Sequence, residues 1–199
     1  MRAGKDPFTD LKAVAGLMRA FDRPWAFCGG WAIDLFLDRK TRDHQDVDVA
    51  LFRQDQLAAQ AFLMAAGWGL EKAHDGRLSR WNVGEFIEPP LHTIWCKNSG
   101  FRPDFFEVLF NEAEGDWFRF RRKPAVTLEL AKAVQQTEDG LPFLAPEIVL
   151  LYKSNNPDHA GNAADFEAVL PALERRGVVW LRQALNALDP GHAWIARLQ

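Results

Sequence analysis

Cysteine is scarce in this chain of 199 residues, which contains only Cys28 and Cys96. Two cysteines are too few for a disulfide scaffold or for a four-cysteine zinc site. Both lie in apolar stretches, which favours buried, inert thiols over a catalytic nucleophile. Because the N-terminal stretch lacks the apolar segment of a secretion signal, we expect a cytoplasmic protein whose thiols stay reduced.

Long apolar runs and an excess of positive charge are missing as well. No stretch of about 18 apolar residues occurs, so the sequence predicts no transmembrane helix and no membrane partner. The 24 Lys and Arg residues face 27 Asp and Glu residues, which leaves a net charge of −3. Proteins that coat DNA are usually strongly basic, so nucleic acid is a disfavoured partner, although not an excluded one.

Several catalytic motifs are also absent. The sequence has no G-x-x-x-x-G-K-[ST] loop and no G-x-S-x-G elbow, which argues against P-loop kinases and serine hydrolases. Its histidines do not have the spacing of a zinc site. The chemistry must therefore come from another set of side chains.

Aromatic residues, in contrast, are plentiful: 15 Phe and 8 Trp supply enough apolar area for a packed core. Periodicity and turn residues predict an α/β protein with a mixed sheet flanked by helices. We expect an α/β domain over residues 1–124 and a helical C-terminal lobe over residues 125–199. The expected helices cover 8–21, 31–37, 57–67, 146–153, 163–175 and 178–188, and the expected strands cover 25–28, 46–52, 68–72, 91–96, 104–111 and 117–121.

Two carboxylates and two glycines stand out in the N-terminal part. Asp46 and Asp48 alternate along a predicted strand, so their side chains leave the same face. Two negative charges at such a short distance repel each other, and a bound cation relieves this repulsion. Carboxylate oxygens are ligands that suit Mg²⁺. Upstream, Gly29 and Gly30 form a turn into a helix, where backbone N–H groups can approach a phosphate chain. Each feature alone is typical of a solvated strand or an ordinary turn, but their ordered combination indicates a phosphate cradle beside a metal site.

The segments that carry these residues are Gly29-Gly30-Trp31-Ala32-Ile33-Asp34 and Thr41-Arg42-Asp43-His44-Gln45-Asp46-Val47-Asp48. They resemble the signature of the nucleotidyltransferase superfamily related to DNA polymerase β, and above all that of bacterial aminoglycoside and lincosamide nucleotidyltransferases. The resemblance implies the nucleotidyltransferase fold and a role in antibiotic resistance. The implied reaction is the Mg²⁺-dependent transfer of a nucleoside monophosphate, with AMP from ATP as the expected case, to a hydroxyl of a small molecule.

The resemblance also assigns roles to residues. It places metal ligands at Asp46 and Asp48, phosphate contacts at Gly29 and Gly30, and further nucleotide-binding positions at Arg42 and His44. Asp34 is a motif position too, for which we favour a structural role in bracing the following loop.

The superfamily often uses a third carboxylate on a neighbouring strand, for which Asp104 and Glu107 are the candidates. Period two puts Asp104 with Phe106 and Val108, a face that should point toward the helices. Glu107 falls on the opposite, mixed face, so we expect Glu107 to be the third metal ligand and catalytic residue.

The C-terminal part carries a second, shorter resemblance. The segment Pro146-Glu147-Ile148-Val149-Leu150-Leu151-Tyr152-Lys153 is similar to a helix of related bacterial proteins in which a Lys-Asp-x-x-Asp-Phe stretch follows. Here Gly161-Asn162 replaces the Lys-Asp pair, whereas Asp165-Phe166 is kept. Lys153 is a candidate triphosphate ligand, with an ordinary surface lysine as the alternative.

Two other functions stay open at this stage. A toxin-type nucleotidyltransferase acting on tRNA or protein would use the same metal site, and the basic stretch over residues 119–123 is compatible with nucleic acid or phosphate. For that stretch we favour a solvent-exposed strand edged by arginines. A non-catalytic nucleotide-binding module on the same fold is the second alternative, against which the intact pair of Asp46 and Asp48 argues.

Overall fold

The computed structural model of the protein describes residues 6–199; residues 1–5, part of the N-terminal stretch discussed above, lie outside this range. A mixed sheet of ten strands forms the centre, in the order β4-β3-β5-β6-β2-β1-β10-β9, while β7 pairs with the end of β6 and with β8. The strands are β1 (Trp25–Phe27), β2 (Asp48–Phe52), β3 (Gly69–His74), β4 (Arg77–Arg80), β5 (Thr93–Lys97), β6 (Phe105–Glu114), β7 (Trp117–Arg119), β8 (Thr127–Glu129), β9 (Val134–Gln136) and β10 (Pro142–Leu144).

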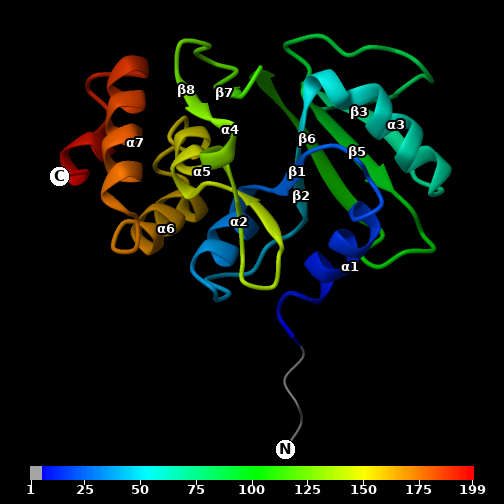
Figure 1. Ribbon diagram of the computed structural model, residues 1–199, viewed down its shortest axis with the longest axis horizontal. Coiled ribbons are helices and arrows are strands. Elements are labelled where there is room, and N and C mark those ends of the chain that lie inside the picture. Colours follow the sequence, from blue (N-terminus) through cyan, green and yellow to red (C-terminus); the bar gives the residue numbers. More distant parts are fainter. Residues whose placement is uncertain (1–5) are drawn as a thin grey trace, which may run out of the picture.

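The helices lie around this sheet (Figure 1). In the described residues they are α1 (Thr9–Met18), α2 (Gly29–Phe36), α3 (Gln56–Ala65), α4 (Leu130–Ala133), α5 (Pro146–Lys153), α6 (Ala160–Val169) and α7 (Arg175–Leu188). Helix α3 packs against β3 at one end of the molecule, whereas α5 contacts α2, α6 and α7 at the other. None of the helices in residues 6–199 combines the length and the apolar character needed to cross a bilayer.

The two faces of the sheet differ around the middle of β6. Phe106 and Val108 are almost fully buried, together with Ile94 and Cys96 on the neighbouring strand β5. The alternate side chains, Glu107 among them, are only half-buried. Strand β6 therefore has one face in the core and one face open, as its period-two pattern predicts. This open face carries the candidate site.

The segment after residue 124 differs from the expected helical lobe. It first supplies β8, β9 and β10, and β10 joins the central sheet beside β1, with Phe143 opposite Phe27. These strands are three residues long, so they show no periodicity that a sequence can reveal. Helices dominate only from Pro146 onward. The division into two domains at residue 124 remains a prediction.

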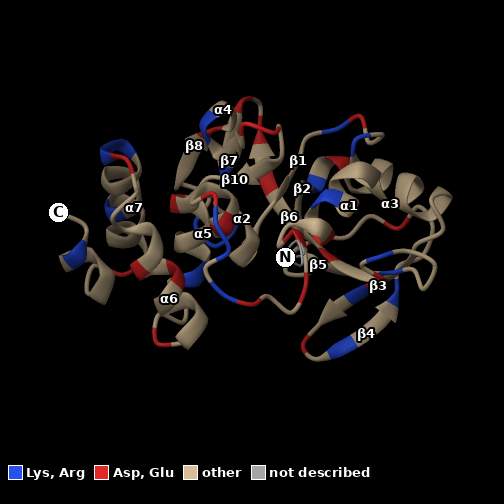
Figure 2. Ribbon diagram, turned by 90° about the horizontal axis from the view of Figure 1, so that it is seen from below, with Lys and Arg blue, Asp and Glu red and all other residues tan. Residues whose placement is uncertain are grey.

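One helix of this part lies earlier than expected. Helix α6 covers Ala160–Val169 rather than residues 163–175. Pro171 explains its early end, because a proline inside a helix removes a hydrogen bond and clashes with the preceding turn. Charged side chains of both signs are spread over the helices and strands rather than collected on one element (Figure 2).

Candidate active site

Three carboxylates converge on the open face of the sheet. Asp46, Asp48 and Glu107 each offer one oxygen atom, and these atoms all lie within 4.8 Å of one another. Asp48 begins β2 and stands opposite Glu107 on the parallel strand β6. The Glu107 N–H donates to the carbonyl of Val47 (2.9 Å), which fixes the two strands at this level.

Asp46 reaches the cluster from the loop just ahead of β2, not from the strand itself. Its backbone is held in place by Trp31, whose indole Nε1 donates to the Asp46 carbonyl (2.8 Å). Asp104, the other candidate for the third carboxylate, is exposed and pairs with Arg102 (3.5 Å). The structure thus brings Glu107, and not Asp104, to the two aspartates.

The two glycines at the start of α2 allow side chains to pack against the helix terminus. Gly29 has a φ of +62°, which favours glycine, and a Cβ atom there would overlap the Asp48 carboxylate. A Cβ atom on Gly30 would overlap the side chains of Arg42 and His44. The motif positions recognised in the sequence are therefore in direct contact in the fold.

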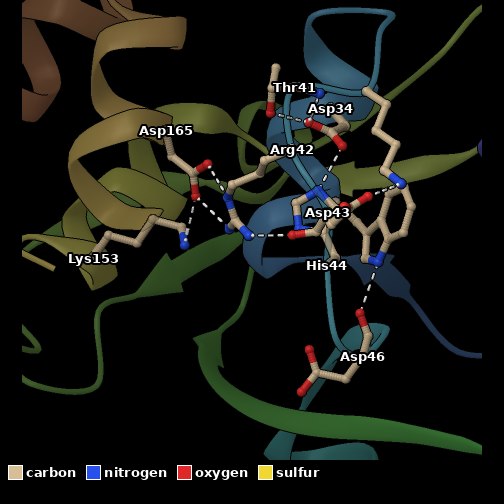
Figure 3. A network of polar contacts seen from close by, with 10 residues as sticks. Asp34, Thr41, Arg42, Asp43, His44, Asp46, Lys153 and Asp165 are labelled. Atoms are coloured by element: carbon tan, nitrogen blue, oxygen red, sulfur yellow. Dashed lines mark hydrogen bonds and ion pairs between the residues drawn. The ribbon is translucent and has the colours of Figure 1, made fainter. Parts of the chain in front are cut away.

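Asp34 holds the loop that carries these side chains. Its carboxylate is fully buried and accepts hydrogen bonds from the backbone N–H (2.9 Å) and the hydroxyl (2.5 Å) of Thr41. The other carboxylate oxygen lies 2.6 Å from Nε2 of His44, whose ring packs on Trp31 (Figure 3). Asp34 has the bracing role that we favoured, and His44 is oriented by it.

Arg42 and Lys153 meet at a buried carboxylate that joins distant parts of the chain. Asp165 accepts two hydrogen bonds from Arg42 (2.9 and 3.0 Å) and forms an ion pair with Lys153 (2.9 Å; Figure 3). Burial raises the pKa of Asp165, but the bond from Arg42 and the charge of Lys153 outweigh it and hold that pKa below its usual value. Lys153 is mostly buried, so it is not an ordinary surface lysine.

The electrostatics of the cluster suit a bound cation. Burial, followed by the charges of Asp46 and Glu107, raises the pKa of Asp48 to about 7. The pKa of Glu107 is raised by burial and then by Asp46. Three repelling oxygen donors without a nitrogen or sulfur ligand form a set that fits Mg²⁺. The nearby Cys28 thiol is buried and its pKa is raised well above the usual value, so it is an inert neighbour, as expected.

This repulsion predicts how the stability of the metal-free protein depends on pH. Because the pKa of Asp48 is higher in the folded than in the unfolded chain, folding is favoured at low pH, and that stability is lost as the pH rises from about 4 to about 7. The asparagine of Asp48→Asn does not titrate, so the variant does not lose this stability. Its free energy of unfolding in EDTA, relative to that of the wild type, should therefore rise by about 2 kcal/mol from pH 5 to pH 8. Urea unfolding of both proteins at several pH values measures this difference. A difference that does not change with pH would contradict the prediction.

The sequence did not reveal the spatial setting of three features of this region. Asp165 was noted only as part of a C-terminal resemblance, although it is the partner of both Arg42 and Lys153. Trp95 stands opposite Glu107 on β5, which only the strand register reveals. Arg121 and Arg122 line a cavity that also contains Gly29 and Lys153.

Comparisons with known proteins identify the family and the fold. The family model described as aminoglycoside-2''-adenylyltransferase matches residues 10–137, more than half of the chain. Comparison with curated protein sequences gave no significant match.

Among solved structures, the solution structure of the antibiotic-resistance factor ANT(2'')-Ia is similar, with a TM-score of 0.61 and 14% identity over 92% of each chain. The lincosamide antibiotic adenylyltransferase LnuA bound to lincomycin has a TM-score of 0.57 and 15% identity, covering 80% of this chain and 94% of LnuA. ANT(2'')-Ia in complex with adenylyl-2''-tobramycin has a TM-score of 0.52 and 13% identity over 94% and 91% of the two chains. At these identities the structures demonstrate a shared fold.

The nucleotidyltransferase fold predicted from the segments around Gly29 and Asp48 is thereby confirmed. The family match covers both segments, so it includes the paired aspartates and the glycine turn. The chain therefore belongs to the aminoglycoside-2''-adenylyltransferase family.

Proposed function

We propose that this family member transfers AMP from ATP to a hydroxyl of an aminoglycoside- or lincosamide-like antibiotic, in a reaction that depends on Mg²⁺. Nucleotidyl transfer is the activity of the family, and the nucleotide, the metal and the residue roles are our proposal. The observation that carries it is the convergence of Asp46, Asp48 and Glu107 beside the Gly29 turn. The complex of ANT(2'')-Ia with adenylyl-2''-tobramycin supports an adenylylated acceptor of this type.

In this mechanism the three carboxylates would hold the metal, and the backbone at Gly29 and Gly30 would face the phosphates. A bound Mg²⁺ would supply charge neutralisation for the phosphoryl group that is transferred. The acceptor hydroxyl releases its proton to solvent as its oxygen attacks the α-phosphorus in line, the bond from the α-phosphorus to the oxygen that bridges it to the β-phosphorus breaks, and pyrophosphate leaves. The protein contributes mainly by positioning the two substrates and by neutralising charge. Asp165 supports this by holding Arg42 and Lys153 at the edge of the cluster.

The open face of the sheet beyond Glu107 is suited to the acceptor. Trp95 stands opposite Glu107 in the strand register, and Glu71 stands opposite Trp95. The rings of Trp95 and Phe105 pack edge to face at 5.2 Å. Lys97 pairs with Glu71 (2.5 Å) and lies over the Trp95 ring, so the remaining negative charge beside this aromatic surface comes from the carboxylate cluster. Aromatic surface next to that cluster favours a hydroxylated molecule that also carries amino groups. This charge pattern favours an antibiotic-like acceptor over tRNA, whose phosphates the carboxylates would repel.

The direct test is an incubation of the purified protein with ATP, Mg²⁺ and a panel of aminoglycosides, lincosamides and tRNA. We expect an adenylylated antibiotic by mass spectrometry and an equal amount of pyrophosphate, and both should vanish in EDTA. Parallel reactions with GTP, CTP and UTP identify the preferred nucleotide. Modification of tRNA alone would support the toxin-type alternative. A protein that modifies no acceptor with any of the four nucleotides would contradict the proposal.

A further inference from the structure

A cavity of about 240 Å³ lies next to the carboxylate cluster. It is enclosed by the junction of β1 and α2, the middle of β6, helix α5 and the turn after β7. The polar part of its lining comprises Asn111, Arg121, Arg122, Tyr152, Lys153 and Asn162. Gly29, which contacts the Asp48 carboxylate, also lines it and so connects it to the cluster.

The charge of this cavity is positive and only partly compensated. Lys153 pairs with Asp165, and Arg119, which precedes the cavity residues, pairs with Glu114. Within the described residues, none of the ion pairs includes Arg121 or Arg122. The lining contains no Asp or Glu. Two neighbouring guanidinium groups therefore lie at a cavity without a counter-ion.

The guanidinium groups of Arg121 and Arg122 both pack on the ring of Tyr152, which other contacts hold in place. They lie over the ring of Tyr152, with their central carbons 5.0 Å (Arg121) and 5.6 Å (Arg122) from its centroid. The Tyr152 hydroxyl donates to Oδ1 of Asn111 (2.9 Å), and its ring packs on Phe120. Arg122 also donates to the Tyr152 carbonyl (3.0 Å). Burial, and then the charge of Arg121, lowers the pKa of Arg122, as expected when a partner anion is missing.

We propose that this cavity binds the β- and γ-phosphates of the nucleoside triphosphate, with Arg121 and Arg122 as the side chains that neutralise them. The inference rests on the proposed function and adds a subsite to it. Guanidinium groups suit phosphate because their donors match its oxygens in pairs. The same charges would repel the ammonium groups of an aminoglycoside, which favours an acceptor position outside this cavity. The phosphates that bind here are those that leave as pyrophosphate.

The test is calorimetry of the full chain with Mg²⁺ and three probes: ATP, AMP and inorganic pyrophosphate. Arg121→Gln and Arg122→Gln should each weaken binding of ATP and pyrophosphate about tenfold, and the double variant should weaken it further. AMP should bind all variants equally, because it lacks the β- and γ-phosphates. Lys123→Gln is the matched control: it removes an exposed positive charge from the same stretch and should change nothing.

The outcomes separate this inference from the proposed function. A wild type that binds none of ATP, GTP, CTP and UTP with Mg²⁺ contradicts the proposed function itself. If the wild type binds ATP but not pyrophosphate, or if both variants bind them as the wild type does, only the phosphate subsite is overturned. An equal loss for AMP and ATP would place the nucleoside in the cavity and also overturn it. Melting temperatures show whether each variant is folded. Arg121→Gln removes no hydrogen bond to the backbone, so this variant tests the proposal even if Arg122→Gln unfolds.

Discussion

Asp48→Asn is expected to lower nucleotidyl transfer about a thousandfold while the protein stays folded. Asparagine keeps the shape of the side chain but removes a negative charge within 4.8 Å of the carboxylate oxygens of Asp46 and Glu107. Without that charge the cluster holds Mg²⁺ weakly, and the phosphates lose their link to β2. ATP binding should therefore lose its dependence on Mg²⁺. Calorimetry of ATP with and without Mg²⁺, alongside initial rates of pyrophosphate release, measures both effects.

Two further variants make this test specific. Glu107→Gln should also reduce transfer strongly, because it removes another carboxylate of the cluster. Asp104→Asn is the matched control, since Asp104 lies on the same segment but is exposed and paired with Arg102. It should leave the rate unchanged. Full activity of Asp48→Asn, or an equal loss in Asp104→Asn, would show that the cluster does not bind the catalytic metal.

The part of the site that the sequence could predict is the part built by local rules. The alternation along residues 104–111 selected Glu107 over Asp104, and the structure brings Glu107 to the two aspartates. The face of the sheet on which a strand residue lies can be predicted from the sequence, because successive side chains of a strand leave opposite faces. The turn at Gly29 could also be predicted from a local pattern, because a short glycine segment between a strand and a helix allows close packing. The role of these residues in catalysis remains a prediction.

Other features depend on contacts between residues far apart in the sequence. The pair of Arg42 and Asp165 spans 123 positions, and no local pattern marks it. Strand β10 joins the sheet by pairing with β1, and a strand of three residues is too short to show a periodic pattern in the sequence. Strand β4, in contrast, had a signal that our expected strands omitted. Asp75 and Gly76 both have positive φ between β3 and β4, and an Asp-Gly pair is typical of a tight hairpin.

The largest expected effect on stability belongs to Asp165. Asp165→Asn removes the one carboxylate that pairs with both Arg42 and Lys153 within residues 6–199, and the Asp165 side chain is 1% exposed. Breaking a buried ion pair from one side leaves the partners uncompensated and costs about 3–5 kcal/mol. Because Arg42 is 30% exposed and remains partly hydrated, we expect about 3 kcal/mol, at the lower end of that range. Urea unfolding at pH 7 measures the loss.

Glu167→Gln on the same helix is the control for this variant. It breaks the pair of Glu167 with Arg197, in which both side chains are more than half exposed, and such surface pairs contribute at most about 1 kcal/mol. Adding Lys153→Met to Asp165→Asn removes one uncompensated cation and should recover part of the lost stability. That recovery distinguishes charge from shape, because a shape defect at residue 165 would persist in the double variant. An Asp165→Asn protein as stable as Glu167→Gln would mean that the bridge does not stabilise the fold, and that Arg42 and Lys153 are held by packing alone.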